Sequence, residues 1–533
     1  MPMLTPPIPV PPSPIRVAVD LSLLRPGGEN GGIKPFLFET LLWLGRQARV
    51  PLQFLYLTCS QTHAEVRDEL ARIGDEVICV RDDGGPLPRG DERPPRERLA
   101  VPPPADLLWQ LRARVLYCPF GPVDFALPGV CTISTIVDVL HRDFPWSLGG
   151  QHNAERERVF QAIIAQADAL QCNSAHVISR MHEHFGVPAE RMFTVYNAVH
   201  QRFATLPAAA DSRAKASRPA PFFFYPANAW RHKNHETLLL AYGMYRHEAL
   251  ANGRTPWPLV LTGHEDQRWA EMRALAKTLD LLGDSAVRFV GYVPSSEFGR
   301  LWETAGALVF PSLHEGFGIP LLEAMEHDVP VLCGRDGSLP EVGADACLFI
   351  EARRPEALAE GMTRLETDAS LRQRLVEAGR RRLADFSQDR EAGRLLDVIV
   401  GLAGTSPPYR PSVRGIFPDG WTERRALLAL PAAPADAPRP ARLTLRLHPL
   451  PAPRHLQLRA GRGDLPLGGF DVPAHRIDLE IAVDFRPDGG ALVLEVPDAA
   501  NLNPADERLH GICLQSATLR LADGQEFPLF AVR

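Results

Sequence analysis

The chain has 533 residues, 45% of them hydrophobic and 23% charged, the composition of a soluble globular protein with room for three domains. Its formal net charge of −6 excludes a global basic field that would attract nucleic acid or an anionic membrane. Only four of its 58 basic residues are lysines, and a lysine among arginines can place a compact charge on a phosphate.

The eight cysteines include no C-x-x-C pair, so the sequence indicates neither a zinc site nor a disulfide framework, and a reducing cytosol fits best. We interpret residues 1–14, MPMLTPPIPVPPSP, as a proline-rich, disordered head. They lack the charged and apolar regions of a signal peptide, so none is expected there. No stretch approaches the ~20 apolar residues of a membrane span, so any membrane association is expected to be peripheral.

The first half of the chain predicts strands that alternate with helices. A strand at Ile15–Leu21 leads through a glycine-rich loop to a helix from about residue 34 to 47. Further strands are expected at residues 53–58, 76–81, 114–118 and 131–136, and this alternation favours a parallel sheet. The glycine loop lacks the G-x-G-x-x-G spacing of a dinucleotide site, which argues against a dehydrogenase. Residues 82–104 are rich in proline, glycine and mixed charge and predict a long exposed loop.

Polar residues follow the last of these strands. The segment TIVDVLHRDFP, residues 135–145, carries Asp138 and His141. A strand at residues 167–172 then precedes Ser174, which is a plausible N-cap of the next helix. Residues 204–221 are rich in alanine, proline and serine and predict a linker.

A second α/β unit is predicted after the linker. Its first strand, residues 222–225, leads to PANAWRHKNH, in which Lys233 and Asn234 lie where a helix begins. A cation and a helix N-terminus would converge there on one anion. Strands at Leu259–Thr262 and residues 287–290 follow, the second leading into GYVPSSE.

The stretch AGALVFPSLHEGFGIPLLEAM, residues 305–325, combines a strand, a glycine loop and a helix N-terminus. Gly316 and Gly318 let the backbone approach a ligand closely, and the helix start is a natural seat for a phosphate. Glu315 and Glu323, with seven residues between them, bracket that seat. Together these features suggest a nucleotide-linked substrate.

The C-terminal part has a different pattern. From residue 443 apolar and polar residues alternate in LTLRL, HLQLRA, IDLEIAV, ALVLEV and ATLRLA, which predicts an antiparallel β-sandwich beginning near Gly415. This part contains no lysine and no cluster typical of a catalytic site. Glycan binding, holding of the acceptor and oligomerisation all stay open as its role.

The run EGFGIPLLE, after LVFPS and before EAM, resembles the E-x7-E signature of retaining GT-B-fold glycosyltransferases of family four (glycosyl transferases group 1). Motifs between about residues 15 and 402 follow the family's order. The resemblance implies an α/β fold with two Rossmann-like domains facing a cleft, to which this chain adds the β-sandwich. The expected units are an N-terminal acceptor domain at 15–203, a linker at 204–221, a C-terminal donor domain at 222–385, a crossover helix at 386–403, a linker at 404–414 and the sandwich at 415–533.

The resemblance also assigns roles to residues. It implies that Glu315 contacts the donor sugar and that Asp138 and His141 face the sugar and the acceptor. Val137 stands where many relatives have histidine, so it stays open whether Asp138 or His141 fills the role of that family residue. Lys233 would bind the diphosphate and Glu323 the ribose. Relatives carry an arginine upstream of the lysine, and whether Arg231 replaces it also stays open. The implied donor-binding residues are Gly31, Gly32, Arg231, Lys233, Asn234, Tyr292, Val293, Gly316, Phe317, Gly318, Ile319 and Glu323.

The expected function is retaining transfer of a sugar from a nucleotide-diphosphate donor to a glycan or lipid-linked acceptor of cell-surface polysaccharide, O-antigen or exopolysaccharide. GDP-mannose, UDP-hexose and dTDP-rhamnose all fit as donors. No metal or other cofactor is expected, because the chain has no D-x-D motif. We expect a cytoplasmic protein with no nucleic-acid partner, and the oligomeric state stays open. The alternatives are a sugar-nucleotide epimerase or a phosphorylase on the same fold, and a non-catalytic glycan-binding scaffold.

Overall fold

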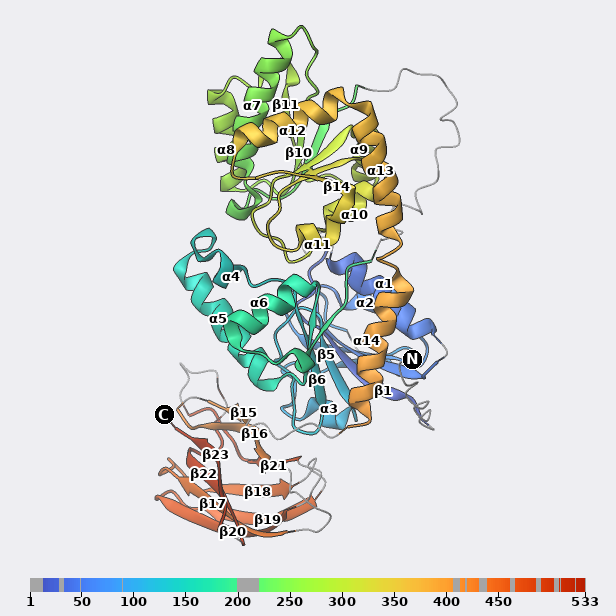
Figure 1. Cartoon of the computed structure of the whole chain (residues 1–533). Coiled ribbons are helices and arrows are strands. Elements are labelled where there is room, and N and C mark those ends of the chain that lie inside the picture. Colours follow the sequence, from blue (N-terminus) through green and yellow to red (C-terminus); the bar gives the residue numbers. More distant parts are fainter. Residues whose placement is uncertain are drawn as a thin grey trace.

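The computed structural model describes residues 13–27, 33–47, 49–88, 90–198, 220–405, 413–417, 419–430, 439–460, 465–485, 490–502, 508, 510–522 and 524–532. Two α/β domains and a β-sandwich are arranged in a row, and the N-terminal α/β domain lies in the middle although it comes first in the sequence (Figure 1). The head predicted at 1–14 and the linker at 204–221 lie almost wholly outside the described residues. All eight cysteines are buried and free.

The N-terminal domain is built on an eight-stranded parallel sheet in the order β4-β3-β2-β1-β5-β6-β7-β8. The central strands of this sheet are short apolar runs, as expected for a parallel sheet whose two faces are both covered by helices. In register, Val17 of β1 lies opposite Phe54 of β2 and Val115 of β5. The strands are β1 (Ile15–Leu21), β2 (Leu52–Cys59), β3 (Glu76–Arg81), β4 (Arg96–Leu99), β5 (Val115–Cys118), β6 (Cys131–Ile136), β7 (Ala169–Cys172) and β8 (Met192–Thr194). The helices are α1 (Ile33–Arg46), α2 (His63–Glu69), α3 (Leu107–Gln110), α4 (Leu140–Asp143), α5 (Gly150–Gln166) and α6 (Ala175–Phe185).

Strand β4 corrects the prediction of a loop over residues 82–104. Its sequence, RERL, has no apolar alternation, yet it pairs in parallel with β3, with Arg98 opposite Ile78. The charged side chains are tolerated because β4 is the edge strand of the sheet. The Arg98 guanidinium lies 2.9 Å from a carboxylate oxygen of Glu76, an ion pair that no local sequence pattern reveals.

The C-terminal α/β domain has a six-stranded parallel sheet in the order β11-β10-β9-β12-β13-β14. Its strands are β9 (Phe223–Pro226), β10 (Leu259–Thr262), β11 (Val287–Gly291), β12 (Ala307–Phe310), β13 (Val331–Cys333) and β14 (Cys347–Phe349). Its helices are α7 (His235–Ala251), α8 (Gln267–Thr278), α9 (Ser295–Thr304), α10 (Ile319–Glu326), α11 (Leu339–Gly343), α12 (Pro355–Thr367) and α13 (Ala369–Leu383). The predicted pair of Rossmann-like domains is therefore confirmed.

Helix α14 (Gln388–Ala403) returns from the second domain to the first and lies along α1 (Figure 1). Leu395, Leu396 and Ile399 are buried in the same apolar core as β1 and α1. The end of the second α/β domain is thus anchored in the core of the first. No helix among the described residues is both long and apolar enough to cross a membrane.

The C-terminal part is an antiparallel β-sandwich, as predicted. One sheet has the order β15-β16-β21-β18-β19 and the other β20-β17-β22-β23. The alternating leucines Leu443, Leu445 and Leu447 all point into the core between the sheets. The strands are β15 (Val413–Ile416), β16 (Thr422–Leu430), β17 (Arg439–Leu447), β18 (Arg454–Ala460), β19 (Leu465–Val472), β20 (Ile477–Phe485), β21 (Gly490–Glu495), β22 (Leu514–Leu521) and β23 (Glu526–Ala531).

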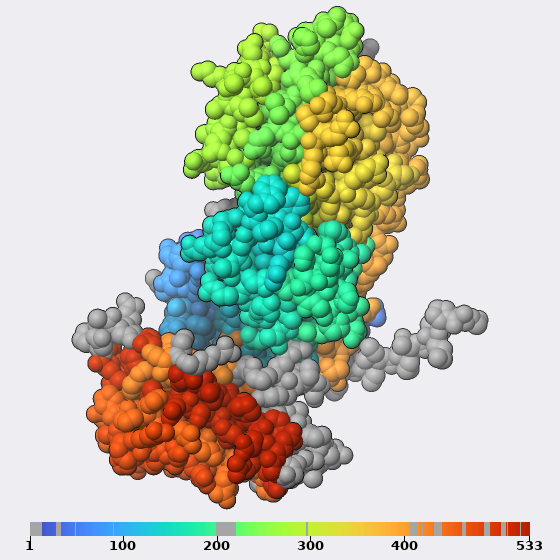
Figure 2. All heavy atoms as spheres, turned by 60° about the vertical axis from the view of Figure 1, so that its left-hand side comes forward, coloured from blue at the N-terminus to red at the C-terminus, as the bar shows by residue number. Residues whose placement is uncertain are grey.

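The sandwich packs against the N-terminal domain, on the side opposite the second α/β domain (Figures 1 and 2). Leu427, Ala491 and Val493 join the apolar core of the N-terminal domain. At the margin of this contact the Arg425 guanidinium lies 2.6 Å from a carboxylate oxygen of Asp106. The sandwich is therefore attached through apolar packing and an ion pair, away from the junction of the two α/β domains.

Candidate functional site

The loop between β12 and α10 carries most of the sequence-predicted site residues, and buried serines hold it in place. The hydroxyl of Ser312 donates to the backbone carbonyls of His232 and His314, both at 3.2 Å. The hydroxyl of Ser338 donates to the carbonyls of Glu315, at 3.1 Å, and Phe317, at 2.9 Å. Both serine side chains are inaccessible to solvent. The loop backbone is therefore fixed independently of any ligand.

Lys233 and Glu315 meet at the carboxyl ends of the adjacent strands β9 and β12. Lys233 Nζ lies 2.6 Å from Glu315 Oε1, and the two side chains are 15% and 12% exposed. The hydroxyl of Tyr225 donates to the Lys233 carbonyl at 2.6 Å and so fixes the short 3-10 turn that carries the lysine. The carboxyl edge of a parallel sheet is where open α/β folds bind ligands. The structure thus brings together a cation and an anion that are 82 residues apart in sequence.

Helix α10 begins next to Glu315. Its N-cap, Gly318, has φ +98°, a backbone conformation that side chains other than glycine rarely adopt, and Pro320 lies in the first turn. The first-turn N–H groups of a helix have no partner within the helix and favour an anion. Ile319 opens the helix, and Glu323 is half-buried one turn further along.

Gly316 is required for contact between the two α/β domains. A Cβ added at Gly316 would lie 1.7 Å from the carbonyl oxygen of Val137 and 3.3 Å from the Cβ of Asp138. The glycine thus lets the C-terminal loop touch the backbone of the N-terminal loop that follows β6. Close approach was expected here, and the observed neighbour is the other domain.

The two N-terminal candidates lie in different surroundings. Asp138 is at the domain contact, where its carboxylate accepts from the backbone N–H of Leu140 at 2.8 Å and pairs with Arg156. His141 is 4% exposed and packs in the N-terminal core, with its ring centroid 4.5 Å from that of Phe160. Burial lowers the pKa of His141. The geometry therefore brings Asp138, and not His141, to the face of the second domain.

Several predicted donor-binding residues occupy structural positions. Phe317 is buried against Tyr196 and Phe386, with ring centroids 6.0 and 5.8 Å apart. The side-chain amide of Asn234 donates to the carbonyls of Pro311, at 3.2 Å, and Ala352, at 2.8 Å.

The remaining candidates are placed as follows. Arg231 is exposed on the turn that carries Lys233, Tyr292 is 65% exposed after β11, and Val293 is buried. Gly31 and Gly32 lie outside the described residues.

Glu341 of α11 is a residue whose role the sequence did not reveal. Its carboxylate accepts from the backbone N–H groups of Ala175, at 2.7 Å, and His176, at 2.9 Å, and from the hydroxyl of Tyr196 at 2.8 Å. An acid of the second domain therefore caps helix α6 of the first. The only sequence signal was that Glu341 belongs to GSLPEVGADA, after the site loop, because the bonded groups are more than 140 residues away.

The N-terminal side of the domain junction holds a small cavity between α1 and the carboxyl ends of β5, β6 and β7. Its polar lining consists of Tyr117, Thr135, Gln171, Asn173 and Asn197. Asn173 is 9% exposed, and its Oδ1 atom has no hydrogen-bond partner among the described residues. The protein contacts around this cavity therefore leave a buried acceptor unsatisfied among the described residues.

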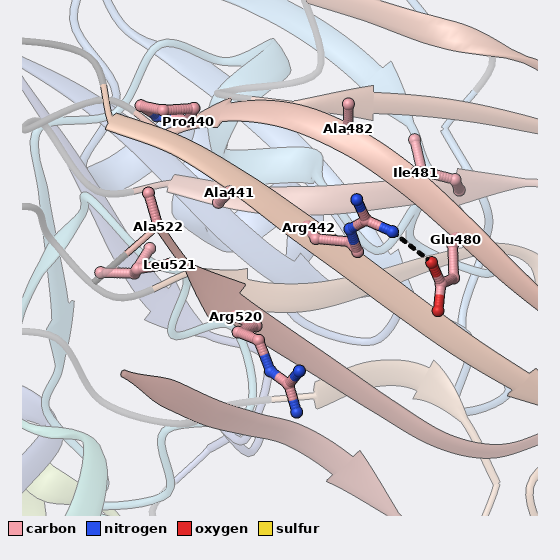
Figure 3. A pocket seen from close by; sticks show the side chains of 9 residues that line it. All are labelled: Pro440, Ala441, Arg442, Glu480, Ile481, Ala482, Arg520, Leu521 and Ala522. Atoms are coloured by element: carbon pink, nitrogen blue, oxygen red, sulfur yellow. Dashed lines mark hydrogen bonds and ion pairs between the residues drawn. The ribbon is translucent and has the colours of Figure 1, made fainter. Parts of the chain in front are cut away.

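A second concave surface lies on the sandwich, on the outer face of strands β17, β20 and β22 (Figure 3). Arg442 pairs with Glu480 across the strands at 2.6 Å, and Arg520 projects nearby. The groove lies on the sandwich, which the N-terminal α/β domain separates from the C-terminal α/β domain that carries Lys233 and Glu315 (Figure 1). Its ion pair is exposed, so it does not form a buried reactive site.

Residues 210–382, about a third of the chain, match the family model of glycosyl transferases group 1. The chain is 33% identical over 159 residues to the O-antigen chain mannosyltransferase B of Escherichia coli, a match that covers 29% of this chain and 39% of that protein. It is 28% identical over 218 residues to the serotype-specific mannosyltransferase WbdA of Escherichia coli, covering 40% of this chain and 26% of that one. The matches thus span well under half the length of these two relatives.

Solved structures show the same fold. A glycosyltransferase from Rickettsia africae superimposes with a TM-score of 0.52 at 13% identity, over 74% of this chain and all of that one. HepE from Anabaena, solved with UDP-glucose, gives a TM-score of 0.53 at 15% identity, over 73% of this chain and all of that one. At such identities the likeness concerns the fold, which is the GT-B arrangement of two facing Rossmann-like domains.

Proposed function

We propose that this chain, whose residues 210–382 belong to the glycosyl transferases group 1, transfers a sugar from a nucleotide-diphosphate donor to a glycan or lipid-linked acceptor. The observation that carries the proposal is the Lys233–Glu315 pair beside the N-terminus of α10, inside the matched region. GDP-mannose is the first donor to test, because relatives are named mannosyltransferases. The O-antigen relative supports cell-surface polysaccharide as the product.

The reaction separates charge, and the site offers a partner for each sign. As the anomeric bond breaks, positive charge develops on the sugar and negative charge on the leaving diphosphate. Lys233 and the first-turn N–H groups of α10 would bind the diphosphate. Glu315 would then accept hydrogen bonds from the sugar hydroxyls and stabilise the oxocarbenium-like centre. Because the lysine and the acid already touch, both charges are held in position before the donor arrives.

The rest of the donor would extend along the carboxyl edge of the sheet. Glu323 would bind the ribose hydroxyls, and backbone groups around Tyr292 and Val293 would contact the base. Arg231, exposed on the same turn as Lys233, would supply a second cation to the diphosphate.

We further propose that the transfer retains the anomeric configuration without a protein nucleophile. The acceptor hydroxyl would attack from the face that the diphosphate leaves, and its proton would pass to the departing phosphate oxygen. Asp138, whose Cβ lies 3.3 Å from a Cβ built at Gly316, would face the acceptor. The chemical step needs no metal, because Lys233 and the helix N-terminus supply the positive charge. A cytoplasmic location, with at most peripheral membrane contact, completes the proposal.

A thermal-shift panel of GDP-mannose, UDP-glucose and dTDP-rhamnose tests the proposal. A ligand at ~100 times its dissociation constant adds about 2.7 kcal/mol of stability. We expect one nucleotide class to stabilise the wild type and Lys233→Ala to abolish the shift. Lys277→Ala removes an exposed lysine on α8 and should leave the shift intact. If no donor shifts the folded wild type, a non-catalytic scaffold becomes the better account.

A further inference from the structure

Asp143, His176 and His314 form a cluster that spans the two α/β domains. Asp143 ends α4, and His176 lies in the first turn of α6, both in the N-terminal domain. His314 belongs to the C-terminal loop between β12 and α10, directly before Glu315. One oxygen or nitrogen atom of each residue lies within 4.8 Å of the other two. Their side chains therefore converge on one point at the domain junction.

The two imidazoles have nitrogen atoms without hydrogen bonds. His314 is 4% exposed, and its Nδ1 lies 3.6 Å from a carboxylate oxygen of Asp143. The Nε2 atoms of His314 and His176 are both buried and have no hydrogen-bond partner among the described residues. Buried polar atoms usually have a partner, which in protein interiors is another polar group, a water or a metal ion. These imidazole nitrogens are thus unexplained by the protein contacts around them.

The carboxylate of Asp143 is oriented by hydrogen bonds from its own domain. Its Oδ1 atom accepts from Arg180 Nε at 2.8 Å and lies 2.7 Å from His184 Nε2. Its Oδ2 atom is the one that faces His314. Metal-binding carboxylates are commonly held in this way by outer hydrogen bonds. The ring of Phe144 lies 5.6 Å from that of His314, centroid to centroid, and adds an apolar neighbour to the cluster.

We propose that Asp143, His176 and His314 bind one Zn²⁺ ion that joins the two α/β domains. Two imidazoles and one carboxylate are a ligand set that suits Zn²⁺, whereas Mg²⁺ and Ca²⁺ prefer oxygen ligands. Three protein ligands leave a fourth position for water.

Metal binding at this point would act on the proposed donor site without taking part in its chemistry. His314 precedes Glu315, so an ion held by all three ligands would fix the loop that positions the Glu315 carboxylate against Lys233. The ion would also hold the domains at the spacing that the Val137–Gly316 contact requires. The inference rests on the ligand geometry alone and stands independently of the donor proposed above.

The test is titration of the metal-free full chain with Zn²⁺ in competition with a chromophoric chelator. We expect one Zn²⁺ per chain, and a rise in melting temperature with Zn²⁺ but not with Mg²⁺. His314→Ala and His176→Ala should each abolish this binding. His247→Ala removes an exposed histidine on α7 and should leave it unchanged.

Co²⁺ provides a second readout on the wild type, which holds even if a variant misfolds. We expect visible absorption bands of a four-coordinate Co²⁺ site, displaced by one equivalent of Zn²⁺. The absence of stoichiometric Zn²⁺ binding to the wild type would overturn the proposal, as would binding that His314→Ala leaves unchanged in a folded variant. Neither result depends on donor binding, which Lys233→Ala tests separately.

Discussion

The two sides of the domain junction differ in how their polar groups are paired. On the C-terminal side, Lys233 pairs with Glu315, and the hydroxyls of Ser312 and Ser338 donate to backbone carbonyls. On the N-terminal side, Asn173 Oδ1 in the cavity lining has no hydrogen-bond partner among the described residues. The one buried atom of the C-terminal loop named above in the same condition is His314 Nε2.

This contrast has an energetic meaning. A buried polar group without a partner costs about 1–3 kcal/mol, so such groups persist where a ligand or water can pair with them. We infer that the ion pair and the serine hydrogen bonds of the C-terminal side position the donor proposed above. Asn173 and His314 keep polar atoms available for a further ligand, water or ion.

Gly316→Ala should have the largest effect on activity, because it would push apart the two loops that touch at Val137 and Gly316. The new Cβ would lie 1.7 Å from the Val137 carbonyl oxygen, and backbone on both sides leaves only a shift of the loops or domains. We expect sugar transfer to fall by about 10²-fold or more, since displacements near 1 Å cost that much. Initial rates with a saturating donor measure it.

Gly401→Ala is the matched control, because a Cβ at that helical position of α14 meets no atom within 4 Å. It should leave the transfer rate unchanged. Equal activity of Gly316→Ala and Gly401→Ala would show that the domain contact is not needed for function.

Asp20→Asn tests a buried charge elsewhere in the N-terminal domain, where Asp124 and Arg414 are its charged neighbours. Burial raises the pKa of Asp20 to about 6, although the N–H and hydroxyl of Ser22 both donate to it. Between pH ~4 and ~6 the folded state therefore binds more protons than the unfolded state, so the free energy of unfolding falls as the pH rises. Above pH 6 the folded protein bears the full cost of burying the ionised Asp20 carboxylate. We expect the variant to gain up to about 3 kcal/mol over the wild type at pH 7 and nothing at pH 4.

Urea unfolding at both pH values measures this difference. Asparagine keeps a carbonyl oxygen that accepts from Ser22, so the comparison isolates the charge. Parallel stability curves for wild type and variant from pH 4 to pH 7 would contradict the assignment of a costly buried carboxylate.

Glu341→Gln weakens the hydrogen bonds between the two α/β domains without introducing a steric clash. The carboxylate accepts two N–H groups at the start of α6 and the Tyr196 hydroxyl, and an amide offers only one neutral acceptor in its place. We expect a loss of roughly 1–2 kcal/mol of unfolding free energy. Denaturant unfolding checks it against Glu360→Gln, an exposed acid on α12 whose change should be neutral.

Ser174→Ala should give the smallest effect, because it removes a cap within one domain. The Ser174 hydroxyl accepts from the backbone N–H of Val177 at 3.1 Å. Losing it should cost about 1 kcal/mol, and Ser174→Thr should recover most of that. A cost well above the effect of Glu341→Gln would mean that the local cap, and not the interdomain acid, holds the start of α6.

Local sequence patterns predicted the strands well where both faces are buried. The strands at Ile15–Leu21 and Leu259–Thr262 have the bounds expected from their apolar runs. Strand β4 was missed because RERL has no apolar period, and its pairing depends on the neighbouring strand. The Ser174 cap was found because a cap is a local signal.

The candidate site was only partly accessible from sequence. Lys233 and Glu315 were found through motifs, and the structure adds that they touch. The roles of Glu341 and His314 arise from contacts between domains, with partners more than 100 residues away, and no local spacing encodes such contacts. His141 was a candidate because its segment resembles a loop of the family, yet its ring packs in the N-terminal core.

The most direct test is to identify the product formed from the stabilising nucleotide sugar and a glycan acceptor. Proton NMR of the new anomeric centre reports both transfer and configuration. We expect a product with the donor's configuration, and a rate about 10²–10³-fold lower in Glu315→Gln, since removing one group that stabilises transition-state charge costs that much. A product of inverted configuration, or an unchanged rate in Glu315→Gln, would contradict a site centred on the Lys233–Glu315 pair.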